Sequence, residues 1–300
     1  MFGKLRSILG DKLRRDEILA PYTYFKIGGA CDFFFEAKKI EDLINAVLLV
    51  QELKINYFIL GGGSNLLVSD KGFKGLVIKN SCRRIEVNKN KIIAQSGAKL
   101  KDLVNMATSK SLSGMEFCAG IPGTVGGAVW GNAGAFGHSI GELLWEAVLL
   151  RKDGEIEIVN RDYFDFDYRE SRLKKSKELL LSAAFLLRKG KNERIKLKVD
   201  NHLAERMKRL PKRHNSAGCF FKNIVTGDGK KISAGFLLDQ VKAKELRIGD
   251  AAVFDKHANV LINRGKAKAK EVKELARIIK DRVKKRFGIK LEEEVVFVGF

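Results

Sequence analysis

The chain has 300 residues, of which 45% are hydrophobic and 31% are charged. This balance excludes an intrinsically disordered chain, which would be depleted in apolar residues. No apolar run approaches the roughly 20 residues that span a bilayer. Lysine and arginine outnumber aspartate and glutamate by 57 to 36, giving a formal net charge of +21. Such an excess is typical of nucleic-acid binding, but here the charges are interleaved, which favours a solvated basic surface.

The first third of the chain predicts alternating strands and helices. Apolar residues recur at helical spacing over residues 40–53 and 100–109, which predicts two amphipathic helices. Short apolar segments predict strands at 32–36, 57–60, 66–68, 77–78 and 85–87.

The remaining two thirds predict strands at 147–151 and 179–187 and a charged helix within 189–213, with a domain junction near residue 200. The clearest pattern is an apolar stripe over 268–287, which predicts a long amphipathic helix. Gly288 is expected to end that helix. A closing strand is expected over 294–298.

Common site motifs are missing from the sequence. The chain contains no G-x-G-x-x-G, no G-x-x-x-x-G-K-[ST] and no H-E-x-x-H, so a Rossmann dehydrogenase, a P-loop and a zinc site are not supported. No metal site is predicted. The N-terminal segment lacks the apolar core of a secretory signal. Cys31, Cys82, Cys118 and Cys219 are widely separated, which favours reduced thiols in a cytoplasm over disulfides.

Two glycine-rich segments suggest a ligand site of another kind. Residues 59–68 are predicted to form a strand, a triple-glycine turn and a second strand, and residues 119–135 contain almost no bulky polar side chains. Turns without side chains expose backbone N–H groups that can cradle an anion. A chain of small residues can also lie flat against a planar ligand. The alternatives are a tight turn that needs positive φ and a glycine-rich packing layer.

Six segments, in order over most of the chain, resemble those of the UDP-N-acetylenolpyruvoylglucosamine reductases, the MurB family of peptidoglycan precursor synthesis. The first three are TYFKIGG at 23–29, GGGSNLL at 61–67 and AGIPGTVGGAVWGNAGA at 119–135. The others are YRES at 168–171, SAGCFFKN at 216–223 and LEEEV at 291–295. Together they are far more specific than any one of them.

The resemblance implies an α+β fold, with a two-part FAD-binding domain of the vanillyl-alcohol-oxidase (PCMH) type and a smaller α/β substrate-binding domain. The expected FAD-binding subdomains are residues 1–80 and 81–199, the second joined by the closing strand 291–300. The substrate-binding domain is expected at 200–290. The chain resembles the shorter class of the family, which lacks a tyrosine-bearing loop over the substrate, because its five tyrosines leave none for such a loop.

The resemblance also implies the reaction. NADPH, as co-substrate, reduces non-covalently bound FAD, and hydride passes from flavin N5 to C3 of the enolpyruvyl ether of UDP-N-acetylglucosamine. A proton then reaches C2, which gives UDP-N-acetylmuramate. A cytoplasmic monomer without nucleic-acid or membrane partners is expected.

Two residues match the positions at which the family stabilises the enolate. Arg169 offers a planar guanidinium that can hold a carboxylate and bind it more strongly as charge develops. Glu294 is expected on the closing strand, where a glutamate beside a carboxylate would be protonated. The alternatives are an ion pair between Arg169 and Glu170 or Asp167, and a merely charged strand end at Glu294.

Cys219 departs from the family pattern, which has a serine as the proton donor at this position. A thiol is far more acidic than an alcohol, with a pKa of about 8.5 in model peptides, so it can donate the C2 proton. It also brings a liability, because an accessible thiolate oxidises and alkylates. The alternative is a buried small residue, with water as the proton source. Cys31, Cys82 and Cys118 have apolar or glycine-rich surroundings and are expected to be buried and slow to react.

Further residues are implied to bind the cofactor or the substrate. Valine in place of Gly62 or Gly126 is expected to occupy the path by which the flavin approaches. The substrate-binding residues are Tyr168, Lys222 and Asn223, and Lys208, Arg209, Lys212 and Arg213 either face the diphosphate or lie on a solvated helix. The cofactor-binding residues are Gly61, Gly62, Gly63, Ser64, Asn65, Leu66, Ile121, Pro122, Thr124, Gly126, Gly127, Asn132, Ala133 and Gly134.

Two alternative functions remain open from the sequence. A related FAD enzyme could oxidise a sugar or hydroxy acid, although residues 219–223 and 291–295 argue against it. A basic RNA-binding protein would explain the charge but not the glycine-rich segments, and no stacked-aromatic motif is present. One further departure from the family pattern is Asp250, which replaces a glycine and leaves the local turn uncertain.

Overall fold

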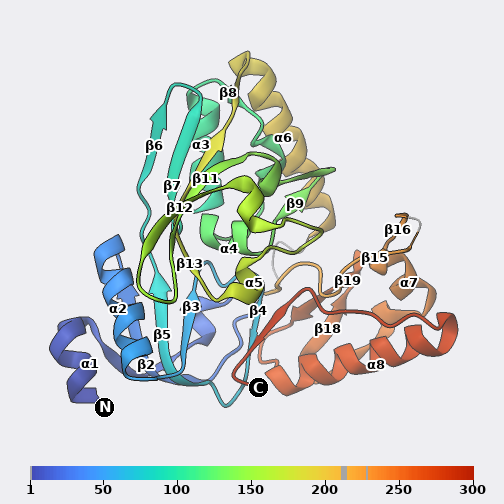
Figure 1. The fold of residues 1–300 in the computed structure, drawn as a ribbon. Helices are drawn as coiled ribbons and strands as arrows, with labels where there is room; N and C mark the ends of the chain where they lie inside the picture. Colours follow the sequence, from blue (N-terminus) through green and yellow to red (C-terminus); the bar gives the residue numbers. More distant parts are fainter. Residues whose placement is uncertain (1, 211–214, 228) are drawn as a thin grey trace. The chain divides into compact units, whose positions relative to one another are not determined.

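The computed structural model describes residues 2–210, 215–227 and 229–300. The chain forms two compact units, each built from segments that are distant in sequence (Figure 1). The first unit comprises Met1–Arg15, Phe33–Gly62 and Gly75–Arg206, and the second comprises Asp16–Asp32, Gly63–Lys74 and Met207–Phe300. The three-part division expected from the sequence stays a prediction, because compactness alone does not show which segments fold independently.

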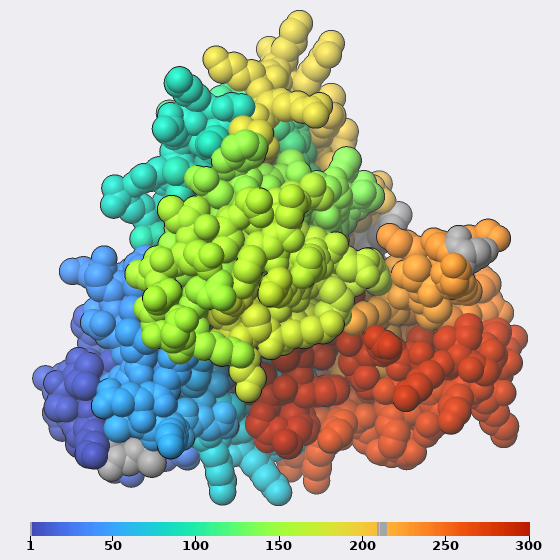
Figure 2. Space-filling model, viewed as in Figure 1, coloured from blue at the N-terminus to red at the C-terminus, as the bar shows by residue number. Residues whose placement is uncertain are grey.

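An antiparallel sheet in the order β12-β11-β13-β7-β6 forms the larger part of the first unit. Alternation along β7 buries Ile92 and Ala94 and leaves Ile93 exposed. Helices α3 and α4 pack against this sheet and share its apolar core. Figure 2 shows the part of the chain from β11 to α5 as a continuous yellow-green surface. The elements are β6 (Ile85–Asn88), β7 (Lys91–Gln95), α3 (Leu100–Ser109), α4 (Val125–Trp130), β11 (Leu144–Leu150), β12 (Ile156–Asn160), α5 (Leu173–Ser176) and β13 (Leu179–Leu186).

A second sheet has the order β1-β2-β5-β3, and its strands β3 and β5 are parallel. Helix α2 buries Leu43, Val47 and Val50 in the same core as Leu76 and Ile78 of β5. Strands β1, β2 and β5 each include residues of both units. The elements are α1 (Phe2–Leu9), β1 (Arg14–Ile18), β2 (Ala30–Ala37), α2 (Ile40–Glu52), β3 (Tyr57–Leu60) and β5 (Phe73–Asn80).

The second unit contains the antiparallel sheet β17-β18-β19 and a parallel pair formed by β4 and β20. Helix α8 packs against β17 and β18 and buries Val272, Leu275, Ile279 and Val283. Gly288 ends the helix with a φ of 69°. The elements are β4 (Leu66–Val68), β15 (Ile224–Val225), β16 (Lys231–Ile232), α7 (Ala234–Gln240), β17 (Arg247–Ile248), β18 (Ala251–Phe254), β19 (His257–Asn263), α8 (Ala269–Phe287) and β20 (Val296–Val298).

The structure confirms the predicted α+β content. The helices predicted at 40–53, 100–109 and 268–287 are α2, α3 and α8, each within one residue of the expected ends. The charged segment forms α6 (Asn192–Arg209), and the chain leaves the first unit after Arg206. Among the described residues, no helix combines the length and apolar character needed to cross a membrane. Short strands complete the fold: β8 (Leu112–Ser113), β9 (Gly134–Ala135), β10 (His138–Ser139) and β14 (Arg188–Lys189).

Candidate active site

The two glycine-rich segments meet within the first unit. The first follows β3, and the second enters α4 at Thr124, whose hydroxyl accepts a hydrogen bond from Gly127 N at 3.4 Å. A Cβ at Gly61 would lie 2.7 Å from Thr124 Oγ1, and one at Gly62 would lie 2.6 Å from Gly123 Cα. Only glycine permits such approaches. The segments therefore form one surface that is lined largely by backbone.

This packing corrects the expected effect of valine at Gly62 and Gly126. A Cβ at Gly62 would collide with the neighbouring glycine-rich segment, and one at Gly126 would lie 3.0 Å from Ser96 O. A side chain at either position would therefore meet the protein itself before any ligand. Gly127 is different: it is exposed, and a Cβ there would lie at an ordinary 3.7 Å from Thr124 Oγ1.

Arg169 lies in a tight turn of the first unit. Asp167 N donates to Glu170 O at 3.2 Å, and Glu170 N donates back to Asp167 O at 3.1 Å. Arg169 itself has a φ of 58°, in the left-handed region that costs free energy for a residue other than glycine. Contacts outside the turn must therefore hold this conformation.

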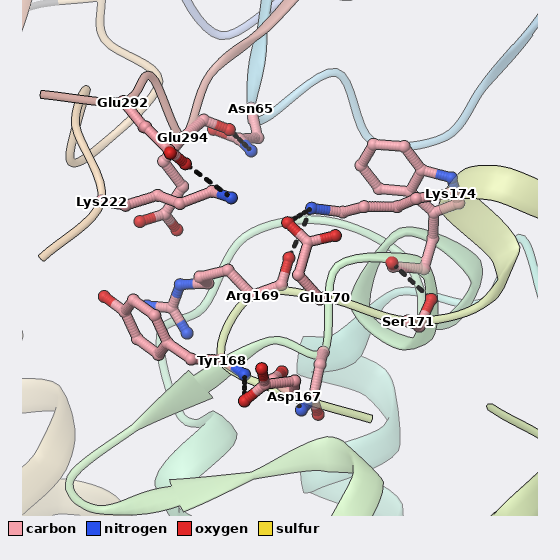
Figure 3. Close-up of polar contacts among 12 residues, drawn as sticks. Asn65, Asp167, Tyr168, Arg169, Glu170, Ser171, Lys174, Lys222, Glu292 and Glu294 are labelled. Carbon is pink, nitrogen blue, oxygen red and sulfur yellow. Dashed lines mark hydrogen bonds and ion pairs between the residues drawn. The ribbon is translucent and has the colours of Figure 1, made fainter. Parts of the chain in front are cut away.

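Three side chains anchor the Arg169 turn (Figure 3). Asn132 Nδ2 donates to Asp167 O at 2.8 Å, and Ser171 Oγ donates to a main-chain carbonyl at the end of α4 at 2.7 Å. Lys174 Nζ donates to Arg169 O. The turn is thus tied to the second glycine-rich segment and to α5.

The Arg169 side chain runs toward the predicted cofactor-binding segment. Its Nη1 donates to Gly134 O at 3.2 Å, and its guanidinium carbon lies 5.3 Å from the centroid of the Tyr168 ring. Glu170, one of the partners considered for Arg169, forms an ion pair with Lys174 at 3.2 Å. The guanidinium is therefore positioned by a backbone carbonyl and an aromatic ring.

Cys219 lies on an extended segment of the second unit that is flanked on both sides. On one side, Cys219 bridges Val260 of β19, and Phe220 N donates to Asn259 O at 2.8 Å. On the other side, Glu294 N donates to Phe220 O at 2.8 Å. The second unit therefore brings the predicted proton donor and the predicted glutamate into neighbouring segments.

The four cysteines divide as the sequence predicted. Cys31, Cys82 and Cys118 are buried, whereas Cys219 is partly exposed. Burial raises the pKa of Cys31 and of Cys118 to about 12, and that of Cys82 to about 11. These three thiols therefore stay protonated and unreactive near neutral pH.

The three consecutive glutamates before β20 are held differently. Lys222 Nζ lies 3.5 Å from Glu292 Oε2, and Lys280 Nζ lies 2.8 Å from Glu293 Oε1 (Figure 3 draws the first pair). The carboxylates of Glu292 and Glu293 thus have lysine partners. The resemblance assigns its role to the third glutamate of the motif, Glu294.

Glu294 precedes the closing strand instead of lying on it, because β20 begins at Val296. Its carbonyl accepts a hydrogen bond from Asn65 Nδ2 at 2.9 Å, and Val296 N donates to Asn65 O at 3.0 Å. Asn65, predicted to bind cofactor, therefore positions the backbone of Glu294.

The predicted site residues are divided between the two units. Arg169 and Tyr168 belong to the first, and Cys219, Lys222, Asn223 and Glu294 belong to the second. The predicted cofactor-binding residues of the first unit are Gly61, Gly62, Ile121, Pro122, Thr124, Gly126, Gly127, Asn132, Ala133 and Gly134, and those of the second are Gly63, Ser64, Asn65 and Leu66. Their roles toward ligands stay predictions.

Sequence reasoning missed two residues that position the site. The Asn259 side chain accepts from Phe221 N at 2.9 Å and donates to Phe221 O at 2.8 Å, which holds the Cys219 segment. Lys174 holds the Arg169 turn. The spacing of four residues between Glu170 and Lys174 was a usable signal, whereas nothing local marks Asn259.

Asp250 stands where the family has a glycine, which left the local turn uncertain from the sequence. The structure shows that the turn forms. Asp250 Oδ1 pairs with Arg247 at 3.1 Å, its Oδ2 accepts from Lys266 N at 2.8 Å, and the hairpin of β17 and β18 forms around it. Of the basic residues considered for the diphosphate, Lys212 and Arg213 lie outside the described residues.

Comparisons with known proteins match both parts of the chain to described families. Residues 31–160 match the family described as FAD binding domain, and residues 210–298 match UDP-N-acetylenolpyruvoylglucosamine reductase, C-terminal domain. The chain is 37% identical over 298 residues to the UDP-N-acetylenolpyruvoylglucosamine reductase of Clostridium novyi, covering 99% of this chain and 95% of the relative. It is 38% identical over 298 residues to that of Geotalea uraniireducens, covering 99% and 97%.

A solved structure has the same fold over nearly the whole chain. The crystal structure of UDP-N-acetylenolpyruvylglucosamine reductase (MurB) from Thermus caldophilus superposes with a TM-score of 0.79 at 32% identity, covering 95% of this chain and 99% of that chain. The expected α+β fold with an FAD-binding domain is thereby confirmed. The chain therefore belongs to the UDP-N-acetylenolpyruvoylglucosamine reductase family, and it is an oxidoreductase with an FAD-binding domain.

Proposed function

We propose that this chain reduces UDP-N-acetyl-3-O-(1-carboxyvinyl)-glucosamine to UDP-N-acetylmuramate, with NADPH as the electron donor, in the cytoplasmic synthesis of peptidoglycan precursors. The observation that carries the proposal is the near-full-length similarity to reductases of this name, together with Arg169, Cys219 and Glu294 at matching motif positions. We propose that the enzyme acts as a monomer.

The first unit supports non-covalent FAD binding. Gly61 and Gly62 pack closely against Thr124 and Gly123, and an added side chain at either glycine would push the two segments apart. Gly127, exposed in the first turn of α4, extends the same surface. Such a surface lets a long planar and diphosphate-bearing ligand approach closely. When bound, FAD supplies the hydride that the reaction needs.

Arg169 binds the substrate carboxylate in this proposal. Its planar fork matches a carboxylate, and the interaction strengthens as negative charge develops on the enolate. The bond from Nη1 to Gly134 O and the anchored turn set the guanidinium in place before the reaction. A donor positioned in advance needs no reorganisation in the transition state, which is the source of its catalytic effect.

Cys219 donates the proton that completes the reduction at C2, and a protonated Glu294 shares the enolate charge with Arg169. Cys219 and Glu294 lie on neighbouring segments of the second unit, which are joined by the hydrogen bond from Glu294 N to Phe220 O. Cys219 is partly exposed, unlike the three buried cysteines. A positioned acid of this kind typically contributes about 10²–10⁴-fold to the rate.

The remaining motif residues recognise the UDP-sugar. Lys222 supplies a positive charge, and Tyr168 supplies an aromatic face beside Arg169. Asn223 Oδ1 accepts from Ala234 N at 3.0 Å, which orients its amide at the start of α7. A basic and amide-bearing segment suits a uridine diphosphate group.

Anaerobic single-turnover kinetics test the proposal. The purified protein should show a flavin absorbance band that NADPH bleaches, and the enolpyruvyl substrate should restore it while UDP-N-acetylmuramate forms, as detected by mass spectrometry. The control measures oxygen consumption with sugars and hydroxy acids. Flavin that is reduced by an alcohol and reoxidised by oxygen, with no reaction of the enolpyruvyl ether, would favour an oxidase instead.

A further inference from the structure

Lys79 lies at the glycine turn that follows β3. In the parallel pairing of β3 and β5, Lys79 is opposite Leu60, the last residue of β3. Its ammonium therefore reaches the next residue of the chain and donates to Gly61 O. Because Gly61 packs against Thr124, the lysine holds one wall of the backbone-lined surface.

The surroundings of Lys79 are unusually basic for a partly buried amine. Burial lowers its pKa to about 8, the positive charges of Arg83 and Lys99 act in the same direction, and Glu36 opposes them. Glu36 also accepts a hydrogen bond from Ser81 Oγ at 2.7 Å. Lys79 is therefore influenced by two cations and by one carboxylate.

Lys99 extends this basic cluster to the second glycine-rich segment. Lys99 forms an isolated bridge with Thr124, and Leu100 N donates to Gly123 O at 3.1 Å. The Lys79 ammonium thus contacts the first glycine-rich segment, and the backbone of Lys99 pairs with the second. Excess positive charge in a partly buried site is stabilised when an anion binds there.

We propose that Lys79, in its protonated form, is a cofactor-positioning residue that holds the Gly61 turn in the shape that receives the diphosphate of FAD. This inference rests on the FAD binding proposed above. A diphosphate diester is a dianion, and it supplies the negative charge that the cluster of Lys79, Arg83 and Lys99 lacks. The lysine acts through the Gly61 carbonyl and through its charge, and it needs no direct contact with the flavin ring.

A pH dependence of FAD affinity follows from this role. A bound dianion favours the charged form of Lys79, so its pKa is higher in the complex than in the free protein. Affinity is then constant below about pH 8 and falls as the pH rises through that value, by at most about tenfold per pH unit. Variants of Lys79 itself show whether the fall reports on this lysine.

The experiment titrates flavin-stripped protein with FAD between about pH 6.5 and about pH 9.5, and follows flavin fluorescence to obtain Kd. Lys79→Gln should weaken binding by about tenfold or more at neutral pH and remove the dependence above pH 8. Lys79→Arg keeps its charge at every pH and should bind with a flat profile. Lys101→Gln removes an exposed charge on α3 and should match the wild type.

The variants and the wild type give separate tests of this role. If Lys79→Gln binds FAD within about twofold of the wild type, with the same pH profile, Lys79 has no role in cofactor binding. If circular dichroism shows that this variant does not fold, the pH titration of the wild type is the test. A wild-type Kd for FAD that does not change with pH would then overturn the proposal. Wild-type protein that binds no FAD at any pH would overturn the proposed function itself.

Discussion

The turn that carries Arg169 and the segment that carries Cys219 are held in place in different ways. The turn contains a left-handed residue and is anchored by the side chains of Asn132, Ser171 and Lys174. The Cys219 segment is held mainly by main-chain hydrogen bonds, to β19 on one side and to the chain before β20 on the other. Substitutions around the turn should therefore displace its arginine, whereas the segment should tolerate changes in its own side chains.

This difference permits a thiol at position 219. Main-chain hydrogen bonds hold the backbone at Cys219 whatever its side chain is, so we expect an exchange between serine and cysteine to leave the backbone in place. At position 169 the backbone is strained, and the guanidinium is tied to Gly134 O. A change there alters both the group and its support.

The largest effect on the reaction rate is expected from substitutions of Cys219, on the segment held by main-chain hydrogen bonds. Cys219→Ala should fold normally, because the ladder remains, yet it should reduce the enolpyruvyl ether about 10²–10⁴-fold more slowly through loss of the acid. Cys219→Ser should stay active. Single-turnover rates with pre-reduced flavin measure both, and NADPH should reduce the flavin of each variant normally. An alanine variant as fast as the wild type would make Cys219 a packing residue.

The next effect tests the anchored turn. Arg169→Lys keeps the charge but loses both the fork and the bond to Gly134 O. Turnover should fall by about 10²–10³-fold, as for other losses of a charge-stabilising donor, with a smaller change in KM. Reduction of the flavin by NADPH serves as the internal control. Equal slowing of both half-reactions would remove Arg169 from the proposed step.

A smaller effect is expected when an anchor of the turn is removed. Asn132→Ala deletes the bonds to Asp167 O and from Gly141 N, and it leaves the buried Gly141 N without this partner. The free energy of unfolding should fall by about 1–3 kcal/mol, and kcat should fall with it because the Arg169 turn loosens. Asn201→Ala, at an exposed position of α6, is the matched control. A stable Asn132→Ala variant with normal kcat would show that the turn holds its own shape.

Periodicity alone predicted the helices well, because the buried residues of α3 and α8 repeat at helical spacing. Periodicity did not predict which strands pair with one another. Strand β4 pairs with β20 from the other end of the chain, and no local pattern records that partner. The choice depends on long-range packing, which the sequence of either strand does not specify.

The sequence indicated which residues belong to the site, but not which main-chain groups their side chains contact. The motifs placed Arg169, Cys219 and Glu294 through resemblance. The side chains of Asn65 and Asn132, predicted to bind the cofactor, also bond to the main chain at Glu294 and Asp167. An amide can serve a ligand or a distant backbone group equally well, and only the folded structure shows which partner lies within reach.

The smallest effect separates the three glutamates before β20. Glu292 is exposed, and its pair with Lys222 should contribute no more than about 1 kcal/mol. Glu292→Gln should therefore leave the melting temperature almost unchanged and alter kcat little. Glu293→Gln breaks a less exposed pair with Lys280 and should cost somewhat more stability, again with little change in kcat.

Glu294→Gln, in contrast, should slow enolpyruvyl reduction without destabilising the fold, because its main-chain bonds to Phe220 O and Asn65 persist. Comparing kcat with thermal stability across the three variants isolates the catalytic glutamate, and a loss of kcat at Glu292 in place of Glu294 would reassign that role.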